Sequence, residues 1–168
     1  MEDRLMQYIH YYDSPLGKIL LSAEDEKLTG LWFKDQKYFA SALDKEYEER
    51  DLEIFDQTFR WLDEYFAGRQ PDFMPEISLK TTEFRKKVFE ALMKIPYGKT
   101  VTYKQIGDMI CEKGKNISYR AIGSAIGHNP ISIIIPCHRV LGSDGSLTGY
   151  AGGMDRKEKL LKLEGVRR

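Results

Sequence analysis

The segment Pro136-Cys137-His138-Arg139-Val140 places a thiol beside an imidazole, a pairing that suits nucleophilic catalysis. Cysteine attacks as the thiolate, and a neighbouring imidazole or positive charge raises the thiolate fraction at neutral pH. The apolar, mostly β-branched run before it, residues 131–135, predicts a buried strand that ends at Pro136. Neighbours on a strand point to opposite faces, so Cys137 and His138 can cooperate only if Pro136 marks a turn or if a water links them.

Zinc binding is the rival use of cysteine and histidine in this chain. Cys111, His128, Cys137 and His138 do not fall into the paired spacing of zinc sites, so we predict no metal, and we expect no cofactor. Cys111 follows an apolar helical segment and is interpreted as a small buried hydrophobe. The glycine-rich segment 142–153 could line a pocket with backbone N–H groups, but it lacks the Gly-Lys-Ser/Thr of a phosphate loop.

Composition sets the class of protein. The 168 residues are 42% hydrophobic and 31% charged, which is typical of a globular protein of one or two domains. The longest apolar runs are far shorter than the roughly 20 residues of a membrane helix. The first residues also lack the features of a secretory signal. We therefore expect a cytoplasmic protein with no membrane partner.

The net charge of zero hides an asymmetry between the two halves. Residues 1–79 contain 9 basic and 18 acidic residues, whereas residues 80–168 contain 17 and 8. This predicts a polyanion such as nucleic acid as the partner of the second half, and attraction between the halves is the alternative that charge leaves open. Residues 70–78, with two prolines and little periodicity, mark the expected boundary between a domain of residues 1–79 and a domain of residues 80–168.

The first half predicts a small sheet followed by helices. Apolar runs of strand length cover residues 6–12, 18–23 and 28–33, and the short turn segments between them predict an antiparallel meander. Helical patterns then cover residues 37–49 and 53–66, and the second places Phe55, Phe59, Leu62 and Phe66 on one face. His10 lies in a strand pattern and is interpreted as structural.

The second half predicts a helix-turn-helix arrangement. Phe84, Val88, Leu92 and Ile95 recur at helical spacing through residues 81–95. A capping box, Thr102 with Gln105, then begins a short helix. After a turn at Gly114, Ser118 caps a third helix over residues 119–126.

The exposed face of the third helix is expected to carry mostly small side chains. Ile122 and Ile126 form its buried stripe, and Arg120 is the one long polar side chain on the remaining surface. The small residues of that surface are Ala121, Gly123, Ser124, Ala125 and Gly127. Such a face suits close approach to a DNA minor groove with little sequence preference, and a tight helix-helix contact is the alternative that this segment leaves open.

Several ordered blocks of the chain resemble one family. The active-site signature of O6-alkylguanine-DNA alkyltransferases is similar to residues 136–140, and the likeness extends upstream through Thr102-Tyr103, residues 120–123 and Asn129-Pro130. Downstream it extends through residues 149–153 and 163–165. The resemblance implies an α/β (α+β) protein, with an N-terminal ribonuclease-H-like structural domain and a C-terminal winged-helix-like, mainly helical domain for DNA binding and catalysis.

The resemblance also implies the chemistry. The protein would be a monomer that binds double-stranded DNA containing O6-alkylguanine and transfers the alkyl group irreversibly to Cys137, less readily from O4-alkylthymine. His138 would act on Cys137 as a water-mediated base, and Glu164 would orient His138. Tyr103 would help rotate the nucleotide and donate a proton, and Asn129 would brace the active-site turn.

By the same likeness the third helix would contact DNA, and Arg120 would insert into the base stack in place of the flipped base. The other helix residues implied in this contact are Tyr119, Ala121, Gly123, Ser124, Ala125 and Gly127. The carbonyls of Cys137 and Val140 would accept hydrogen bonds from the guanine amine. Backbone N–H groups near Tyr150 and Ala151 would hold O6.

Two other functions are left open at this point. A lesion-binding protein without transfer activity would lack the cysteine, so Cys137 argues against it. A thiol hydrolase built on Cys137, His138 and Glu164 would need water to resolve its covalent intermediate, whereas an S-alkyl group offers no carbonyl for attack. The number of alkyl groups transferred per protein molecule separates these possibilities.

Overall fold

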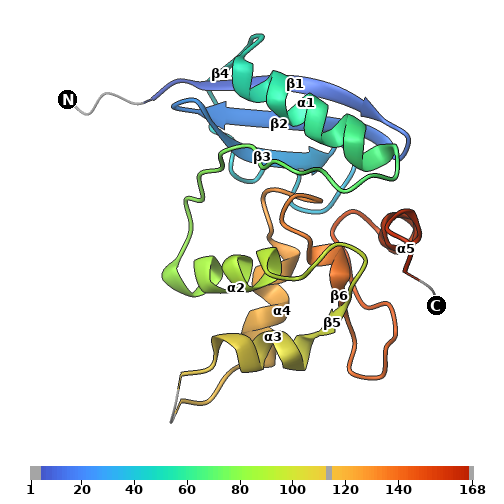
Figure 1. The fold of residues 1–168 in the computed structure, drawn as a ribbon. Helices are drawn as coiled ribbons and strands as arrows, with labels where there is room; N and C mark the ends of the chain where they lie inside the picture. Colours follow the sequence, from blue (N-terminus) through green and yellow to red (C-terminus); the bar gives the residue numbers. More distant parts are fainter. Residues whose placement is uncertain (1–4, 113–114, 167–168) are drawn as a thin grey trace. The chain divides into compact units, whose positions relative to one another are not determined.

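The chain folds as two compact units, Met1–Lys80 and Thr81–Arg168, shown in Figure 1. The computed structural model describes residues 5–112 and 115–166. No helix within these described ranges has the length and apolar character needed to cross a membrane. Each unit has its own buried core and is described by itself.

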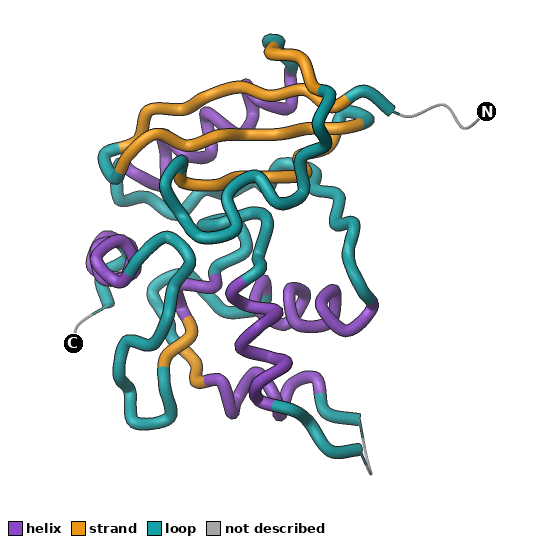
Figure 2. The backbone as a smooth tube through the Cα atoms, turned by 180° about the vertical axis from the view of Figure 1, so that it is seen from behind, coloured by secondary structure: helices purple, strands orange, loops and turns teal. Residues whose placement is uncertain are grey.

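The first unit is a four-stranded sheet with one helix on its face. Strands β1 (Gln7–Ser14), β2 (Gly17–Glu24) and β3 (Lys27–Phe33) pair antiparallel, which confirms the predicted meander. Helix α1 (Glu53–Phe66) has the predicted bounds. It lies across one face of the sheet, and Figure 2 shows the three long strands in front of it.

Alternate side chains of the strands serve opposite faces of this sheet. Both His10 and Tyr12 contact the Phe59 ring of α1, His10 edge-to-face with ring centroids 5.1 Å apart and Tyr12 stacked at 5.7 Å. Ile9 on the other face packs with buried residues of β2 and β3. This period of two is the pattern that a sheet covered on both faces requires. His10 therefore has a structural setting, in which its Nε2 also lies 2.6 Å from Asp51 Oδ1.

The helix predicted over residues 37–49 is wrong. The segment forms turns, in which Tyr38 and Ala40 have φ of 57° and 56°, and then the short strand β4 (Tyr47–Glu49). β4 pairs parallel with β1, so the sheet order is β3-β2-β1-β4. Ala40 and Leu43 still provide apolar cover for the sheet, but from turns, because the open edge of β1 offers β4 hydrogen bonds that a helix would forgo.

The segment before the second unit, residues 76–78, forms backbone hydrogen bonds with β3 of the sheet. The Leu28 N–H donates to the Glu76 carbonyl at 2.8 Å, and the Ser78 N–H donates to the Leu28 carbonyl at 2.9 Å. The proline-containing stretch therefore ends against the edge of β3.

The second unit is mainly helical and contains one small parallel sheet. Its elements are α2 (Glu83–Met93), β5 (Val101–Thr102), α3 (Tyr103–Ile110), α4 (Tyr119–Gly127), η1 (Cys137–Arg139), β6 (Val140–Leu141) and α5 (Met154–Leu163). Helices α2, α3 and α4 pack on one another. Val88 and Leu92 are buried as predicted, whereas Phe84 at the start of α2 is 38% exposed.

The predicted helix-turn-helix is confirmed, with both of its caps. Thr102 Oγ1 accepts from the Gln105 N–H, and the Gln105 side chain accepts from the Thr102 N–H, which completes the capping box. Ser118 accepts from the Ala121 N–H at the start of α4. The turn expected at Gly114 lies outside the described residues.

Candidate active site

The segment that carries Cys137 is a buried turn, so the predicted strand over residues 131–135 is wrong. The Ile134 N–H donates to the Ser132 carbonyl and the Ile135 N–H to the Ile131 carbonyl, contacts that belong to turns. Ile133 has φ of 71°, outside the extended region. These apolar side chains are buried as a strand would bury them, but the backbone bonds to itself and turns back toward α4.

Pro136 changes the direction of the chain immediately before the thiol. Its φ of −82° and ψ of 62° close an inverse γ-turn, in which the Cys137 N–H donates to the Ile135 carbonyl at 2.8 Å. The 3₁₀ turn η1 follows directly. Cys137 and His138 therefore do not alternate across a strand, which meets one of the two conditions set by the sequence for their cooperation.

Asn129 connects the end of α4 to this turn. Its amide Nδ2 donates to the Ile135 carbonyl at 2.8 Å and lies 3.3 Å from Cys137 Sγ, while its Oδ1 accepts from the Ile131 N–H at 2.9 Å. The side chain is buried, so each of these contacts is made away from water. One amide thus fixes both ends of the turn and contacts the sulfur.

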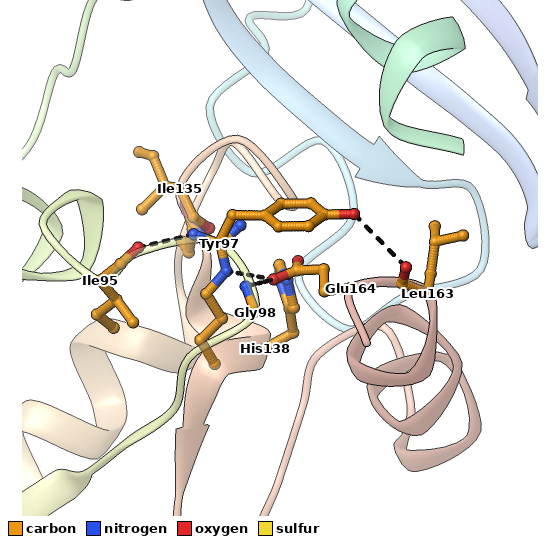
Figure 3. A network of polar contacts seen from close by, with 9 residues as sticks. Ile95, Tyr97, Gly98, Ile135, His138, Leu163 and Glu164 are labelled. Carbon is orange, nitrogen blue, oxygen red and sulfur yellow. Dashed lines mark hydrogen bonds and ion pairs between the residues drawn. The ribbon is translucent and has the colours of Figure 1, made fainter. Parts of the chain in front are cut away.

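Glu164, the C-cap residue of α5, binds several groups of the active-site segment (Figure 3). Its Oε2 lies 2.5 Å from His138 Nε2. Its Oε1 accepts from Arg139 Nε at 2.8 Å and from the Gly98 N–H at 3.0 Å. Arg139 also donates to the Ile95 carbonyl at 2.8 Å. The structure therefore brings Asn129, Cys137, His138 and Glu164 into one buried cluster.

The pKa values of the three ionisable side chains in this cluster, those of Cys137, His138 and Glu164, are shifted in ways that set which of them is charged. Burial raises the pKa of the Cys137 thiol, and the Asn129 hydrogen bond and the Lys157 charge oppose the rise only in part. Burial also lowers the pKa of His138 despite its contact with Glu164. Burial disfavours ionisation of Glu164, but the hydrogen bonds and charges of His138 and Arg139 prevail and lower its pKa to about 2. At neutral pH the cluster holds a carboxylate, a neutral imidazole and a thiol.

The small parallel sheet links Tyr103 to the active-site segment. Val101 pairs with Val140 and Thr102 with Leu141, so the first residue of α3 follows a strand that lies beside β6. Tyr103 is half-buried and Val140 is buried. The carbonyl of Cys137 accepts from the Val140 N–H, which occupies one of its two lone pairs.

The glycine-rich segment 142–153 is a loop, as predicted. Tyr150 places its hydroxyl in the interior, where burial and the nearby Cys137 raise its pKa well above the usual value. Ala151 is half-buried. The loop is therefore in position to border the thiol.

The outer surface of α4 matches the predicted set of small side chains, with one correction. Tyr119, Arg120 and Ser124 are exposed, and Ala121, Gly123 and Gly127 are partly exposed. Ala125 was expected on this surface but is fully buried, because it packs in the core beside Ile122 and Ile126. Its side chain cannot contact DNA.

Sequence reasoning missed two buried cations near the thiol. Arg139 is part of the signature, but the sequence predicted no role for it. In the structure it donates hydrogen bonds to Glu164 and to the Ile95 carbonyl. Lys157 is fully buried on α5, and only its spacing from Leu160 and Leu161 hinted at an inward position. Cys111, predicted to be buried, is exposed because it follows α3 as a C-cap residue. Within the described ranges, no three histidine, cysteine or acidic residues are placed to hold a metal ion.

Comparisons with known proteins cover both units. The family model described as the 6-O-methylguanine DNA methyltransferase DNA-binding domain matches residues 83–166, and that of the ribonuclease-like domain matches residues 7–79. The methylated-DNA–protein-cysteine methyltransferase of Mycobacterium tuberculosis H37Rv is 44% identical over 158 residues, 93% of this chain and 92% of the relative. That of Methanosarcina barkeri is 47% identical, covering 92% and 96%.

Solved structures agree in fold. The crystal structure of Mycobacterium tuberculosis OGT in complex with DNA has a TM-score of 0.82 and 41% identity, covering 94% of this chain and 92% of that one. The crystal structure of Mycobacterium tuberculosis O6-methylguanine methyltransferase has a TM-score of 0.81 and 42% identity, covering 95% and 93%. The ribonuclease-like and DNA-binding arrangement predicted for the two halves is thereby confirmed.

Proposed function

The chain belongs to the 6-O-methylguanine DNA methyltransferase family, and we propose that it repairs DNA by transferring the alkyl group from O6 of guanine to the sulfur of Cys137. The observation that carries this assignment is the buried cluster of Asn129, Cys137, His138 and Glu164 in a chain that is similar to such methyltransferases along nearly its whole length. The acceptor must be a cysteine, and Cys137 is the one held in this cluster.

His138 and Glu164 supply the means to deprotonate the thiol. Because Glu164 is a carboxylate with a pKa of about 2, it accepts a hydrogen bond, and His138 Nε2 must carry the proton. Nδ1 of the neutral ring is then the basic nitrogen, and it takes the thiol proton through a water. A base is needed because burial raises the pKa of Cys137.

The transfer itself is a single displacement. The sulfur lone pair forms the new bond to the alkyl carbon, the bond between that carbon and O6 breaks, and its electron pair remains on guanine. Tyr103 donates a proton to guanine N3 as this charge develops. The product is a thioether, which has no carbonyl for water to attack, so each protein molecule reacts once.

DNA binding must deliver the base to a sulfur whose residue is only 4% exposed. We place the minor groove on the outer surface of α4, where Arg120 fills the space that the flipped base leaves. The remaining contacts would come from Tyr119, Ala121, Gly123, Ser124 and Gly127. The second lone pair of the Cys137 carbonyl and the Val140 carbonyl accept from the guanine amine, and N–H groups at Tyr150 and Ala151 hold O6.

Two further features of the proposal follow from the chemistry. Seventeen basic residues against eight acidic ones in residues 80–168 favour a DNA partner, with affinity that falls as salt rises. A chromosomal substrate and an acceptor that must remain a free thiol favour action in the cytoplasm.

Intact-mass measurement tests the acceptor and the stoichiometry together. After incubation with excess duplex DNA containing O6-methylguanine, the native protein should gain one methyl group. Cys137→Ala should gain none, while the matched control Cys111→Ser, altered at the exposed cysteine, should still gain one. Methyl transfer to Cys111 would refute the assignment of the acceptor, and release of more product than protein would identify a turnover enzyme such as a hydrolase.

A further inference from the structure

Glu164 offers its two carboxylate oxygens to different partners. Oε2 lies 2.5 Å from His138 Nε2. Oε1 accepts from Arg139 Nε at 2.8 Å and from the Gly98 N–H at 3.0 Å. The terminal torsion of a glutamate side chain has only a broad preference of its own. The two donors at Oε1 therefore set the plane of the carboxylate that the imidazole meets.

Arg139 is itself held by residues 94–100, the connection between α2 and β5. Its Nη1 donates to the Ile95 carbonyl at 2.8 Å. Its Cζ lies 5.7 Å from the centroid of the Tyr97 ring, a cation–π contact. The residue is only 8% exposed, and a guanidinium is a rigid plane whose donors keep fixed directions. These contacts fix the orientation in which Nε meets Glu164.

The same connection also contacts the end of α5 directly (Figure 3). The Tyr97 hydroxyl donates to the Leu163 carbonyl in a long hydrogen bond of 3.5 Å. Gly98 has φ of 76°, in the left-handed region, and a Cβ at this position would lie 3.1 Å from the Glu164 carbonyl oxygen. The approach of this turn to α5, which brings the Gly98 N–H to Oε1, therefore favours glycine at residue 98.

The charge of Arg139 acts on the same pair of side chains. Burial lowers the pKa of His138, the hydrogen bond and charge of Glu164 raise it, and the charges of Arg139 and Lys157 lower it. Burial raises the pKa of Glu164, whereas the contacts with His138 and Arg139 lower it to about 2. The pair is therefore a carboxylate and a neutral imidazole at neutral pH. Other ionisable side chains that bear on this pair or on its neighbours are Tyr97, Cys137 and Tyr150.

We propose that Arg139 is a positioning residue for alkyl transfer, which fixes the Glu164 carboxylate so that Oε2 accepts from His138 Nε2 and Nδ1 remains the basic nitrogen. Arg139 acts through these two side chains rather than on the sulfur. The thiol proton moves through water to Nδ1, Nε2 keeps its own proton, and the guanidinium keeps all of its protons throughout. Residues 94–100 thereby become a supporting part of the active site. This inference rests on the proposed function, in which His138 is the base for Cys137.

Two measurements on the full chain separate orientation from charge. NMR titration of the His138 ring, in protein without DNA, gives the pH midpoint of its protonation, and His138→Gln identifies its signals among the three histidines. Single-turnover transfer from saturating O6-methylguanine duplex DNA, followed by intact mass, gives the rate at pH 8.5. The variant is Arg139→Met. The matched control is Arg69→Met, in which an exposed arginine loses its hydrogen bond to Glu64.

In Arg139→Met we expect the His138 midpoint to rise by about one pH unit, because the positive charge that opposed protonation of the ring is gone. The transfer rate at pH 8.5 should also fall by on the order of tenfold, because the carboxylate is no longer held at one angle. Arg69→Met should keep the native values in both measurements. A less stable Arg139→Met protein with an unchanged His138 midpoint would indicate a merely structural role and overturn the proposal, and a native transfer rate at pH 8.5 would do the same.

Arg139→Lys isolates the contribution of geometry. Lysine keeps the positive charge but lacks the planar set of donors that reaches both Glu164 and the Ile95 carbonyl. This variant should therefore keep the native His138 midpoint and still transfer methyl more slowly than the native protein. A native rate in Arg139→Lys would show that charge alone suffices, which would refute the positioning role.

Tyr97→Leu tests the support of the guanidinium without changing Arg139. It removes the ring beside the guanidinium, so transfer should slow while the His138 midpoint stays in place. Together with Arg139→Lys it carries the test if Arg139→Met does not fold. Failure of the proposed function would be distinct, because the native protein itself would then gain no methyl at Cys137, whereas the NMR titration needs no DNA.

Discussion

Glu164→Gln is the substitution that most directly tests the cluster around Cys137. The carboxylate accepts from His138 Nε2, Arg139 Nε and the Gly98 N–H, and its side chain is fully buried. Glutamine has nearly the same shape but one acceptor oxygen and an NH₂ group in place of the second. If the oxygen stays with Arg139 and Gly98, the NH₂ group faces His138 and donates to Nε2.

Reversing the direction of the hydrogen bond between residue 164 and His138 should change both the stability of the protein and the reactivity of the thiol. A shift of the Glu164 pKa from 4.5 to about 2 corresponds to about 3 kcal/mol at neutral pH. Removing one partner of a buried ion pair costs roughly 3–5 kcal/mol, so we expect the free energy of unfolding to fall by about 3 kcal/mol. With Nε2 as acceptor, Nδ1 carries the proton and cannot act as a base, which should slow transfer at neutral pH by about a hundredfold or more.

Two measurements check these values. Urea unfolding gives the change in stability, and single-turnover reaction with O6-methylguanine duplex DNA, followed by intact mass, gives the rate. Glu158→Gln is the matched control, since Glu158 lies on the same helix in a half-exposed pair with Lys162 and should change neither quantity appreciably. A Glu164→Gln protein that is less stable but transfers methyl at the native rate would refute the orientation of His138 by Glu164.

Two other expectations concern DNA contact and pH. Arg120→Ala should slow repair in duplex DNA much more than reaction with the free modified base, because its side chain is exposed at the start of α4 and is proposed to act only on stacked DNA. Equal losses in the two assays would contradict that role. Stability should fall as pH drops below about 6.5, because His138 binds its proton more readily when unfolded, and again from about 4.5 toward 2 as Glu164 does the same. Urea midpoints measured from pH 7.5 to pH 3.5 check this, and a flat profile in the native protein would show that the buried pair contributes nothing.

Local sequence determined much of the secondary structure. The bounds of α1 and the capping box at Thr102 depend on residues a few positions apart. The spacing of these residue types in the sequence is therefore enough to predict their hydrogen bonds and packing. The same holds for the hairpins of β1, β2 and β3, where short turns join apolar runs. The family signature around Cys137 also predicted the nucleophile, because it places a cysteine beside a histidine.

Hydrogen bonds that the pattern of apolar residues does not express decided the rest. Residues 37–49 have a helical composition, but Tyr47–Glu49 instead pairs as a strand with the free edge of β1. Residues 131–135 have the composition of a strand, but Asn129 holds them as a turn. For residues 37–49 the competing hydrogen bonds come from β1, whereas residues 131–135 form their own turn hydrogen bonds and are braced by Asn129, which a pattern of apolar residues does not express.

The ionisation states of the active-site side chains also could not be predicted from the local sequence. The sequence by itself predicted which sulfur reacts, since the motif is contiguous. The family resemblance implied that Glu164, 26 residues away, orients His138, but only the tertiary structure gives the contact between their side chains and the buried position of Lys157. A pKa depends on burial and on charges a few ångströms distant, and both are set by how the chain packs rather than by which residue comes next.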